Sequence, residues 1–438
     1  MPDFATSADP AVQRQLDRLA ALSPGADILG LERITRLLDR IGSPHRRLPP
    51  VLHVAGTNGK GSTCAFLRAA IEAAGLRCHV YSSPHLVRFN ERIRLAGKLI
   101  EDAELAPLLG EVLDAGGDIG ASFFEVTTAA AFLAFARTPA DACVVEVGLG
   151  GRLDATNVIE DPAVTGIAQL GIDHQAFLGE TIIAIAREKA GIAKRGRPLV
   201  TLDYPEEVAD AVLDVAAAAG APIYRAAGDW SFGQAGDRLA YRAEGDALTV
   251  PLPALPGAHQ FANLGLAIAM LRHQDRIDIP VAAIEAAPLA ARWPARMQRL
   301  DAGPLTRLLP PGSAIWLDGG HNANAAEAMR AAIADLARGR PLHVVLGMLD
   351  NKDARAMVAC LAPIARSLTG VPVPGHGFHA PAHLAALAGA IGRAAPDVPS
   401  ALAAVAASAD PAAPLAVLVC GSLYLAGIVL EANGQLPD

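Results

Sequence analysis

The sequence contains few cysteines, and they form no recognisable metal-binding pattern. Its 438 residues include five cysteines, an odd number, and none of them stands in a Cys-x-x-C pair. Each lies within an apolar strand or helix pattern, which is typical of a buried thiol. We therefore expect buried thiols, and no cysteine-based metal site, at Cys64, Cys78, Cys143, Cys360 and Cys420.

Long hydrophobic runs are also missing. No stretch of about 18 apolar residues occurs, which argues against a membrane-spanning helix. The first ten residues, MPDFATSADP, lack the basic segment and apolar core of a signal peptide. We therefore expect a soluble, cytoplasmic protein with no membrane partner.

A surplus of positive charge is the third absence. The chain has 37 Lys and Arg against 45 Asp and Glu, a formal net charge of −8. Nucleic-acid binding needs a concentrated positive surface, so we expect no nucleic-acid partner. A small anionic substrate needs only a few well-placed arginines and is compatible with this balance.

The sequence does contain a regular alternation of strands and helices. Domains usually hold about 100–200 residues, so this length indicates two or three of them. After one or two opening amphipathic helices, short apolar runs separated by helical stretches predict parallel sheets buried on both faces. The expected strands are Val51–Ala55, Arg77–Tyr81, Ala142–Val147, Val164–Ala168 and Pro198–Leu202, then Ala314–Leu317, Leu342–Leu346, Leu368–Val371 and Leu415–Cys420.

A break in this pattern predicts where one domain ends. Trp-Pro, several arginines and Asp-Ala-Gly-Pro interrupt the alternation at residues 293–301, and a polar stretch at 229–252 predicts an appended antiparallel hairpin. The expected fold class is α/β. Residues 1–296 would form a P-loop, parallel-sheet, ATPase-like domain, and residues 297–438 a smaller Rossmann-like α/β domain.

The strongest motif is a glycine-rich loop that directly follows the first strand and opens a helix. Glycines let backbone N–H groups line a phosphate-sized hollow, the helix N-terminus adds a partial positive charge, and Lys60 adds a full one. Strand, loop and helix in this order are the context that a P-loop requires. We therefore expect the phosphates of a nucleotide to be bound by Gly56, Thr57, Asn58, Gly59, Lys60, Gly61 and Ser62, and the resemblance given next implies that this nucleotide is ATP.

This loop departs from the generic G-x-x-x-x-G-K-[ST] pattern, because Gly61 separates Lys60 from Ser62. The G-T-N-G-K form resembles the ATP loop of the Mur ligase superfamily, and its G-K-G-S ending is similar to the folylpolyglutamate and dihydrofolate synthase branch. The resemblance runs from about residue 29 to 425 through several motifs in the same order. It implies an ATP- and Mg²⁺-dependent ligase that joins L-glutamate to a folate-type carboxylate through an acyl phosphate.

Polar side chains follow neighbouring strands where a parallel sheet gathers its ligands. Glu146 ends one apolar run, and His174 follows another. Each alone has an ordinary structural interpretation, but together they predict a magnesium site, although imidazole is an unusual ligand for this ion. The resemblance implies this pair, adds Ser83, and implies a carbamylated Lys189 that binds a second Mg²⁺. Without the resemblance, Lys189 would be interpreted as half of a helix ion pair.

The resemblance assigns further residues to ATP and glutamate. The pattern D-x-x-H-N places Asp318 on the nucleotide and His321 near the reacting groups. We therefore expect Lys60, Lys189, Asp318 and His321 to be catalytic, with Asn263 and Arg296 as further ATP contacts. Glutamate is expected at Arg92, His321 and Ser422, although Arg92 alone would be interpreted as part of a solvated loop.

Three segments resemble the pterin site of bifunctional bacterial enzymes. They supply Gly30, Leu31 and Glu32, then Phe123, Phe124 and Glu125, then Leu153, Asp154 and Ala155. The structural alternative for Asp154 is that it caps the turn before Thr156. We expect a monomeric enzyme that acts on both dihydropteroate and tetrahydrofolate, and an enzyme acting on folates only is the alternative.

Three other functions are disfavoured. A cell-wall Mur ligase would carry a uridine-nucleotide domain, yet only 55 residues precede Gly56. The segment Leu349–Asp353 resembles the Asn-Lys-x-Asp of a GTPase, but Ala354 stands where the aspartate should be. A simple binding module with a P-loop would not need the carboxylates and histidines described above.

Overall fold

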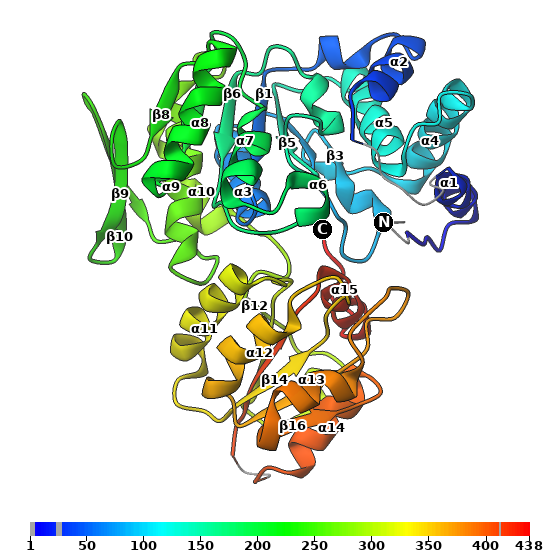
Figure 1. The fold of residues 1–438 in the computed structure, drawn as a ribbon, viewed down its shortest axis with the longest axis vertical. Coiled ribbons are helices and arrows are strands. Elements are labelled where there is room, and N and C mark those ends of the chain that lie inside the picture. Colours follow the sequence, from blue (N-terminus) through cyan, green and yellow to red (C-terminus); the bar gives the residue numbers. More distant parts are fainter. Residues whose placement is uncertain (1–4, 23–28, 411–412) are drawn as a thin grey trace. The chain divides into compact units, whose positions relative to one another are not determined.

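The structure, a computed structural model, describes residues 5–22, 29–410 and 413–438. The chain divides into two compact units (Figure 1). The first comprises Met1–Ala254 and Gln260–Arg292, and the second comprises Leu255–His259 and Trp293–Asp438. The second unit thus begins at Trp293, near the expected boundary, and also includes a short segment that precedes α9 (His259–His273).

The first unit is built on an eight-stranded sheet in the order β4-β3-β2-β5-β1-β6-β7-β8. The six strands β2, β5, β1, β6, β7 and β8 run parallel to their neighbours. At the edge next to β2, β3 pairs antiparallel with β2, and β4 pairs antiparallel with β3. Every residue of β1 and β5 is buried, as expected for strands covered on both faces. The bounds are β1 Val51–Ala55, β2 Cys78–Tyr81, β3 Ile93–Leu95, β4 Lys98–Leu99, β5 Ala142–Glu146, β6 Val164–Ile167, β7 Leu199–Thr201 and β8 Ile223–Arg225.

Helices of this unit pack on the sheet and on one another through apolar stripes. In α2, Ile34, Leu37 and Leu38 are buried, which is the helical spacing seen in the sequence. They join one core with α1, α4 and α5. The bounds are α1 Pro10–Ala21, α2 Glu32–Arg40, α3 Lys60–Ala73, α4 Asp102–Gly116, α5 Phe123–Arg137, α6 Gln175–Leu178, α7 Ile182–Ala190, α8 Glu206–Ala219 and α10 Val281–Ala290.

The polar stretch at 229–252 forms a three-stranded antiparallel sheet, one strand more than the expected hairpin. Its strands are β9 Trp230–Ala235 and β10 Arg238–Ala243, both labelled in Figure 1, and β11 Asp246–Pro251. Strand β11 packs on α10. Both connecting turns use a glycine with positive φ, Gly236 at 65° and Gly245 at 68°, which suits tight hairpin turns.

The second unit contains a six-stranded sheet in the order β12-β13-β17-β14-β15-β16. All neighbouring pairs are parallel except β12 with β13. The strands are β12 Gln298–Arg299, β13 Ala314–Leu317, β14 Leu342–Leu346, β15 Ser367–Gly370, β16 Gly392–Ala394 and β17 Ala416–Cys420. The helices are α11 Ala323–Ala337, α12 Ala354–Leu361, α13 Pro381–Leu387, α14 Val398–Ala407 and α15 Leu423–Ala432.

The expected α/β fold class is confirmed, and the differences lie in short or polar elements. Apart from the additional strand at 229–252, the strands that were not predicted are β3, β4, β8, β12 and β16, which have at most three residues, too few to show a hydrophobic period. Four cysteines are buried as expected, whereas Cys360 is only half-buried on α12. Within the described ranges, no helix is long and apolar enough to cross a membrane.

Candidate active site

The glycine-rich loop adopts a shape that only glycine permits at two positions. Gly59 precedes α3 with φ 85°, and a Cβ there would lie 2.2 Å from Oδ1 of Asn263. Gly56 has φ 150°, and a Cβ there would lie 2.9 Å from Cβ of Ala168, just after β6. The loop is therefore packed tightly between β6 and α9, which places Asn263, an expected ATP contact, directly beside it.

The side of the loop next to β6 is fixed by hydrogen bonds. The amides of Thr57 and Asn58 donate to the carbonyl oxygen of Gln169 at 2.8 and 3.1 Å. The Thr57 hydroxyl donates to the carbonyl oxygen of Gly171 at 3.0 Å. These bonds hold the loop in one conformation without using the amides at the start of α3, whose N-terminal end attracts anions.

Two lysine amines converge on one carbonyl oxygen of the loop. Lys60 Nζ donates to the oxygen of Gly56 at 3.2 Å, and Lys189 Nζ, from α7, donates to the same oxygen at 2.9 Å. Lys189 is only 4% exposed. Its burial, and secondarily the positive charge of Lys60, lower the pKa of Lys189 to about 7, against weaker opposing effects of Asp173 and Asp154. Much of Lys189 is therefore a neutral amine at neutral pH.

The strand order brings several expected metal ligands together at the carboxyl ends of neighbouring strands. Ser83 follows β2, Glu146 ends β5, and His174 follows β6, so the order β2-β5-β1-β6 places their segments around the phosphate loop. Glu146 is buried and is the register partner of Val54. His174 is exposed at the start of α6, with φ 52°.

These residues fit a magnesium ion only in part. Glu146 and Ser83 supply the oxygen atoms that Mg²⁺ prefers, and His174 supplies a less suitable nitrogen. Across the described ranges, no group of three or more His, Cys, Asp or Glu side chains could hold a metal by itself. An ion here would complete its shell with phosphate oxygens and water, as magnesium usually does at nucleotide sites.

Asp154 is buried within its own loop, at 2% exposure. Its Oδ1 accepts hydrogen bonds from the amide and the hydroxyl of Thr156, and its Oδ2 accepts one from the amide of Leu149 at 2.8 Å. Burial raises the pKa of Asp154, although these hydrogen bonds oppose the shift. The contacts agree with the structural alternative, a cap on the turn before Thr156, and the pterin role of Asp154 stays a prediction.

The three segments expected at a pterin site lie together. Helices α2 and α5 contact each other, and both contact the 3₁₀ helix Ala155–Val158 that follows Asp154. Phe124 lies against Gly148, where a Cβ would come within 2.3 Å of the ring. Gly30 lies beside Glu32 Oε2, Leu31 and Leu153 are half-buried, and Phe123 and Ala155 are buried.

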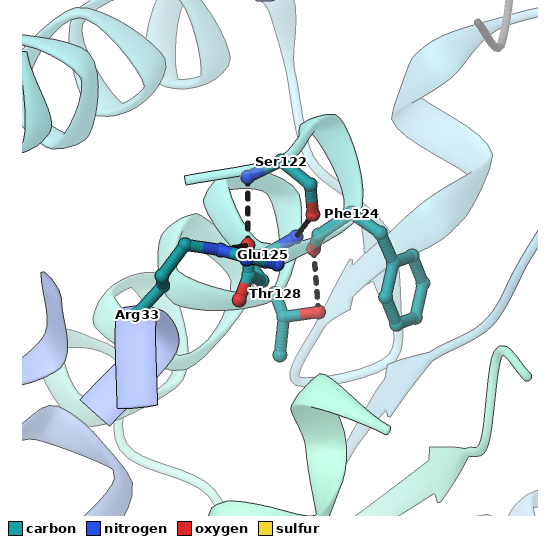
Figure 2. Close-up of polar contacts among 5 residues, drawn as sticks. All are labelled: Arg33, Ser122, Phe124, Glu125 and Thr128. Carbon is teal, nitrogen blue, oxygen red and sulfur yellow. Dashed lines mark hydrogen bonds and ion pairs between the residues drawn. The ribbon is translucent and has the colours of Figure 1, made fainter. Parts of the chain in front are cut away.

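Glu125 has a clear structural role in this region, and Figure 2 shows its contacts. Its Oε2 accepts hydrogen bonds from the Ser122 amide at 2.7 Å and from Nε of Arg33 at 3.0 Å. The Ser122 hydroxyl accepts the Glu125 amide in return, which completes a capping box at the start of α5. Glu125 thus joins α5 to α2 and orients the helix turn that carries Phe124.

Arg92 does not lie in a solvated loop, which was the structural alternative. It is 1% exposed, and its guanidinium carbon lies 5.5 Å from the ring centroids of both Phe89 and Phe123. Its Nε donates to Nδ1 of His85 at 2.9 Å. A buried guanidinium between two aromatic rings is held in a fixed orientation. Arg92 therefore contacts Phe123, in one of the segments expected at the pterin site, and its glutamate role stays a prediction.

In the second unit, Asp318 follows β13 and organises its loop. It is buried, and its oxygens accept the amides of Met297 at 2.8 Å and of Gly320 at 2.7 Å. His259 lies near enough that the Asp318 carboxylate favours its protonated form, although burial lowers the pKa of His259 overall. Ser422 is buried and caps α15 by accepting the Tyr424 amide at 3.1 Å.

Arg296 and His321 lie next to the loop that Asp318 starts. A Cβ on Gly319 would come within 3.1 Å of Nη1 of Arg296, and His321 Nδ1 is 3.1 Å from the Gly319 carbonyl oxygen. The residues on both sides of Arg296, Ala295 and Met297, have positive φ angles of 54° and 44°. Such angles cost free energy for non-glycine residues and often mark functional positions.

Comparison with known proteins gives this arrangement a family. Residues 296–423 match the model of the "Mur ligase, glutamate ligase domain". The chain is 34% identical over 348 residues to the dihydrofolate synthase/folylpolyglutamate synthase of Escherichia coli, covering 79% of this chain and 78% of that protein. The chain belongs to the dihydrofolate synthase/folylpolyglutamate synthase family. It is also 34% identical to a folylpolyglutamate synthase of Lacticaseibacillus casei, covering 78% of this chain and 81% of that one.

Solved structures of this synthase family have the same fold. Escherichia coli FolC in complex with DHPP and ADP superposes with a TM-score of 0.87 at 32% identity, covering 97% of each chain. A bifunctional folylpolyglutamate synthase/dihydrofolate synthase with Mn, AMPPNP and L-glutamate bound superposes at 0.85 and 33% identity, covering 98% of this chain and 99% of that one. A nucleotide and a divalent metal are therefore bound by members of the family.

Several residues that hold the expected site residues in place were not predicted from the sequence. Gln260 accepts a hydrogen bond from Asn263 at 2.9 Å, His85 accepts one from Arg92, and His53 and Thr156 lie behind Asp154. A histidine inside the apolar run Val51–Ala55 is a visible signal in the sequence. The other contacts join residues whose roles depend on packing.

Proposed function

We propose that the chain is an ATP-dependent ligase that adds L-glutamate to dihydropteroate, giving dihydrofolate, and to tetrahydrofolates, extending a polyglutamate tail. The observation that carries this proposal is the phosphate loop with Lys60 and Lys189 on one carbonyl oxygen, in a chain of this synthase family. Relatives named for both activities, and similar structures that hold nucleotide, DHPP or L-glutamate, support it.

The phosphate loop accounts for the first half of the reaction. The loop amides and Lys60 hold the ATP phosphates, and the γ-phosphoryl group passes in line to the acceptor carboxylate. Bound Mg²⁺, two ions in our proposal, at Glu146, Ser83, His174 and a modified Lys189, supplies charge neutralisation for the phosphates. Asn263, Arg296 and Asp318 complete the ATP site in this proposal.

The second half forms the amide. The neutral amine of L-glutamate, held by Arg92, His321 and Ser422, attacks the acyl phosphate carbon. A C–N bond forms, the bond from that carbon to the phosphate oxygen breaks, and the amine loses a proton. Water must be excluded while the acyl phosphate exists, because hydrolysis would waste ATP. The family match to residues 296–423 supports a role of the proposed domain 297–438 in glutamate ligation. In this proposal residues 1–296 bind the pterin and most of the ATP.

Lys189 is proposed to be carbamylated. Its neutral amine adds to CO₂, forming an N–C bond and releasing one proton, and the product carries a carboxylate-like oxygen pair. Support comes from its burial and from its pKa of about 7, because only the unprotonated amine reacts. A buried carbamate would also place a negative charge beside the amine of Lys60, which lies on the same carbonyl oxygen.

The remaining parts of the proposal concern context. We infer a cytoplasmic monomer that binds small molecules and no nucleic acid. The net charge of −8 supports the last of these points, because nucleic-acid binding needs a concentrated positive surface. A second candidate function is folylpolyglutamate synthesis alone. The Lacticaseibacillus casei relative with that name, and the capping contacts of Asp154, favour it.

A two-substrate assay tests the proposal. Purified protein would receive ATP, Mg²⁺ and L-glutamate with either dihydropteroate or tetrahydrofolate, and both ADP release and product mass would be measured. We expect a mass gain of one glutamate residue with each acceptor. Activity with tetrahydrofolate alone selects the second candidate, and no activity with either acceptor refutes the ligase proposal.

A further inference from the structure

A buried hydrogen-bond chain connects the strand that leads into the phosphate loop with the loop that carries Asp154. His53, in β1, is 0% exposed, and its Nε2 lies 2.8 Å from the Thr156 hydroxyl oxygen. The Thr156 hydroxyl is in turn hydrogen-bonded to Asp154 Oδ1 at 2.5 Å. His53 and Thr156 are 103 positions apart, so this link exists only in the folded chain.

The direction of each hydrogen bond follows from the donors present. Thr156 has one hydroxyl hydrogen, which it donates to the Asp154 carboxylate, because a carboxylate only accepts. The hydroxyl oxygen must then accept from His53, so Nε2 carries the ring hydrogen. Burial lowers the pKa of His53 to about 3, which keeps the ring neutral. Its other nitrogen, Nδ1, is buried and has no hydrogen-bond partner among the residues that the structure describes.

Packing alone does not explain a histidine at this position. A buried acceptor without a partner destabilises the fold, and an aliphatic side chain such as its neighbours Leu52 and Val54 would avoid that loss. The contact that distinguishes His53 from an aliphatic residue is the one made by Nε2, which reaches Asp154 through Thr156. The Asp154 carboxylate is also near enough to influence both Lys60 and Lys189 electrostatically.

We propose that His53 and Thr156 are positioning residues that hold the Asp154 carboxylate for an acceptor ring rich in N–H donors. The hydrogen bonds from Thr156 occupy Oδ1 of Asp154 and so fix the plane of the carboxylate. Oδ2 accepts one amide hydrogen, from Leu149, and a carboxylate oxygen can accept more than one. An aminopyrimidine-type ring, such as a pterin, offers adjacent N–H donors to such an oxygen. This inference rests on the proposed function and deepens its acceptor site.

Two pairs of variants separate positioning from simple stability. Thr156→Val keeps the shape and removes the hydroxyl, whereas Thr156→Ser keeps the hydroxyl. His53→Leu removes the donor, whereas His53→Gln retains an amide donor. We expect Thr156→Val and His53→Leu to raise the KM for dihydropteroate about tenfold or more, with the KM for ATP changed less than about twofold. Serine and glutamine should restore most of the dihydropteroate affinity.

Binding measured without turnover makes the test independent of ligase activity. The Kd of the wild-type protein and each variant for dihydropteroate, for tetrahydrofolate and for ATP would be measured by calorimetry, alongside melting curves. Weaker acceptor binding in Thr156→Val with recovery in Thr156→Ser supports the inference, even if no ligation occurs and the proposed function fails. A lower Tm with unchanged acceptor Kd, or equal losses for acceptor and ATP, overturns it. A wild-type protein that binds neither acceptor also overturns it.

Discussion

Replacing Lys189 by methionine should change how the stability of the protein depends on pH. Burial lowers the pKa of Lys189 from 10.5 to about 7. Between these two values the unfolded chain holds a proton on this amine and the folded protein does not. The free energy of unfolding therefore rises with pH across this window, and below about pH 7 the folded state must hold a buried cation. Lys189→Met removes both effects.

The expected size follows from the linkage of protonation to folding. One bound proton of difference gives a slope of about 1.4 kcal/mol per pH unit, so wild type should gain about 2.7 kcal/mol over Lys189→Met between roughly pH 7.5 and 9.5. Lys189→Met also loses the hydrogen bond to Gly56. That loss offsets the plot of unfolding free energy against pH of the variant from that of wild type by a constant and leaves the difference in slope unchanged.

Urea unfolding of both proteins at several pH values, in CO₂-free buffer, measures this difference. Lys98→Met is the matched control, because Lys98 is an exposed lysine of the same unit and should give a curve parallel to wild type. Added bicarbonate should then stabilise wild type and leave Lys189→Met unaffected. Parallel pH curves for wild type and Lys189→Met would refute the buried neutral amine and remove the support for carbamylation.

The remaining predictions concern catalysis. Lys60→Ala should lower kcat about 10²–10³-fold or more with little change in Tm, since the loss of one transition-state charge contact is of this size. Lys98→Ala is its control. Near-normal turnover by Lys60→Ala would contradict the P-loop assignment. Glu146→Gln and His174→Ala should both raise the Mg²⁺ concentration for half-maximal activity, and unchanged values in a titration would exclude them from a metal site. Asp318→Ala should strongly lower the rate of glutamate ligation while changing Tm little, and full ligation by the variant would contradict a role of Asp318 in the active site.

Contiguous segments were predictable from the sequence alone. The phosphate loop depends on a strand, a glycine turn and a helix that are neighbours in the chain, so its composition was sufficient to place β1, the loop and α3. The long strands of both sheets were predictable for the same reason. Strands that are buried on both faces need apolar side chains throughout, and that requirement is visible in five consecutive residues.

Contacts between distant segments were decided only by the tertiary structure. The sequence around Lys189 is typical of a surface helix. Its pKa is lowered because folding brings it to Gly56, 133 positions away, and removes it from water. Arg92 likewise lies between aromatic rings instead of in solvent, and Asp154 is held from behind by Thr156 and His53. The local sequence pattern indicates backbone preference and hydrophobic periodicity. The charge state of a side chain depends on its burial and its hydrogen-bond partners, and both depend on which remote segments pack together.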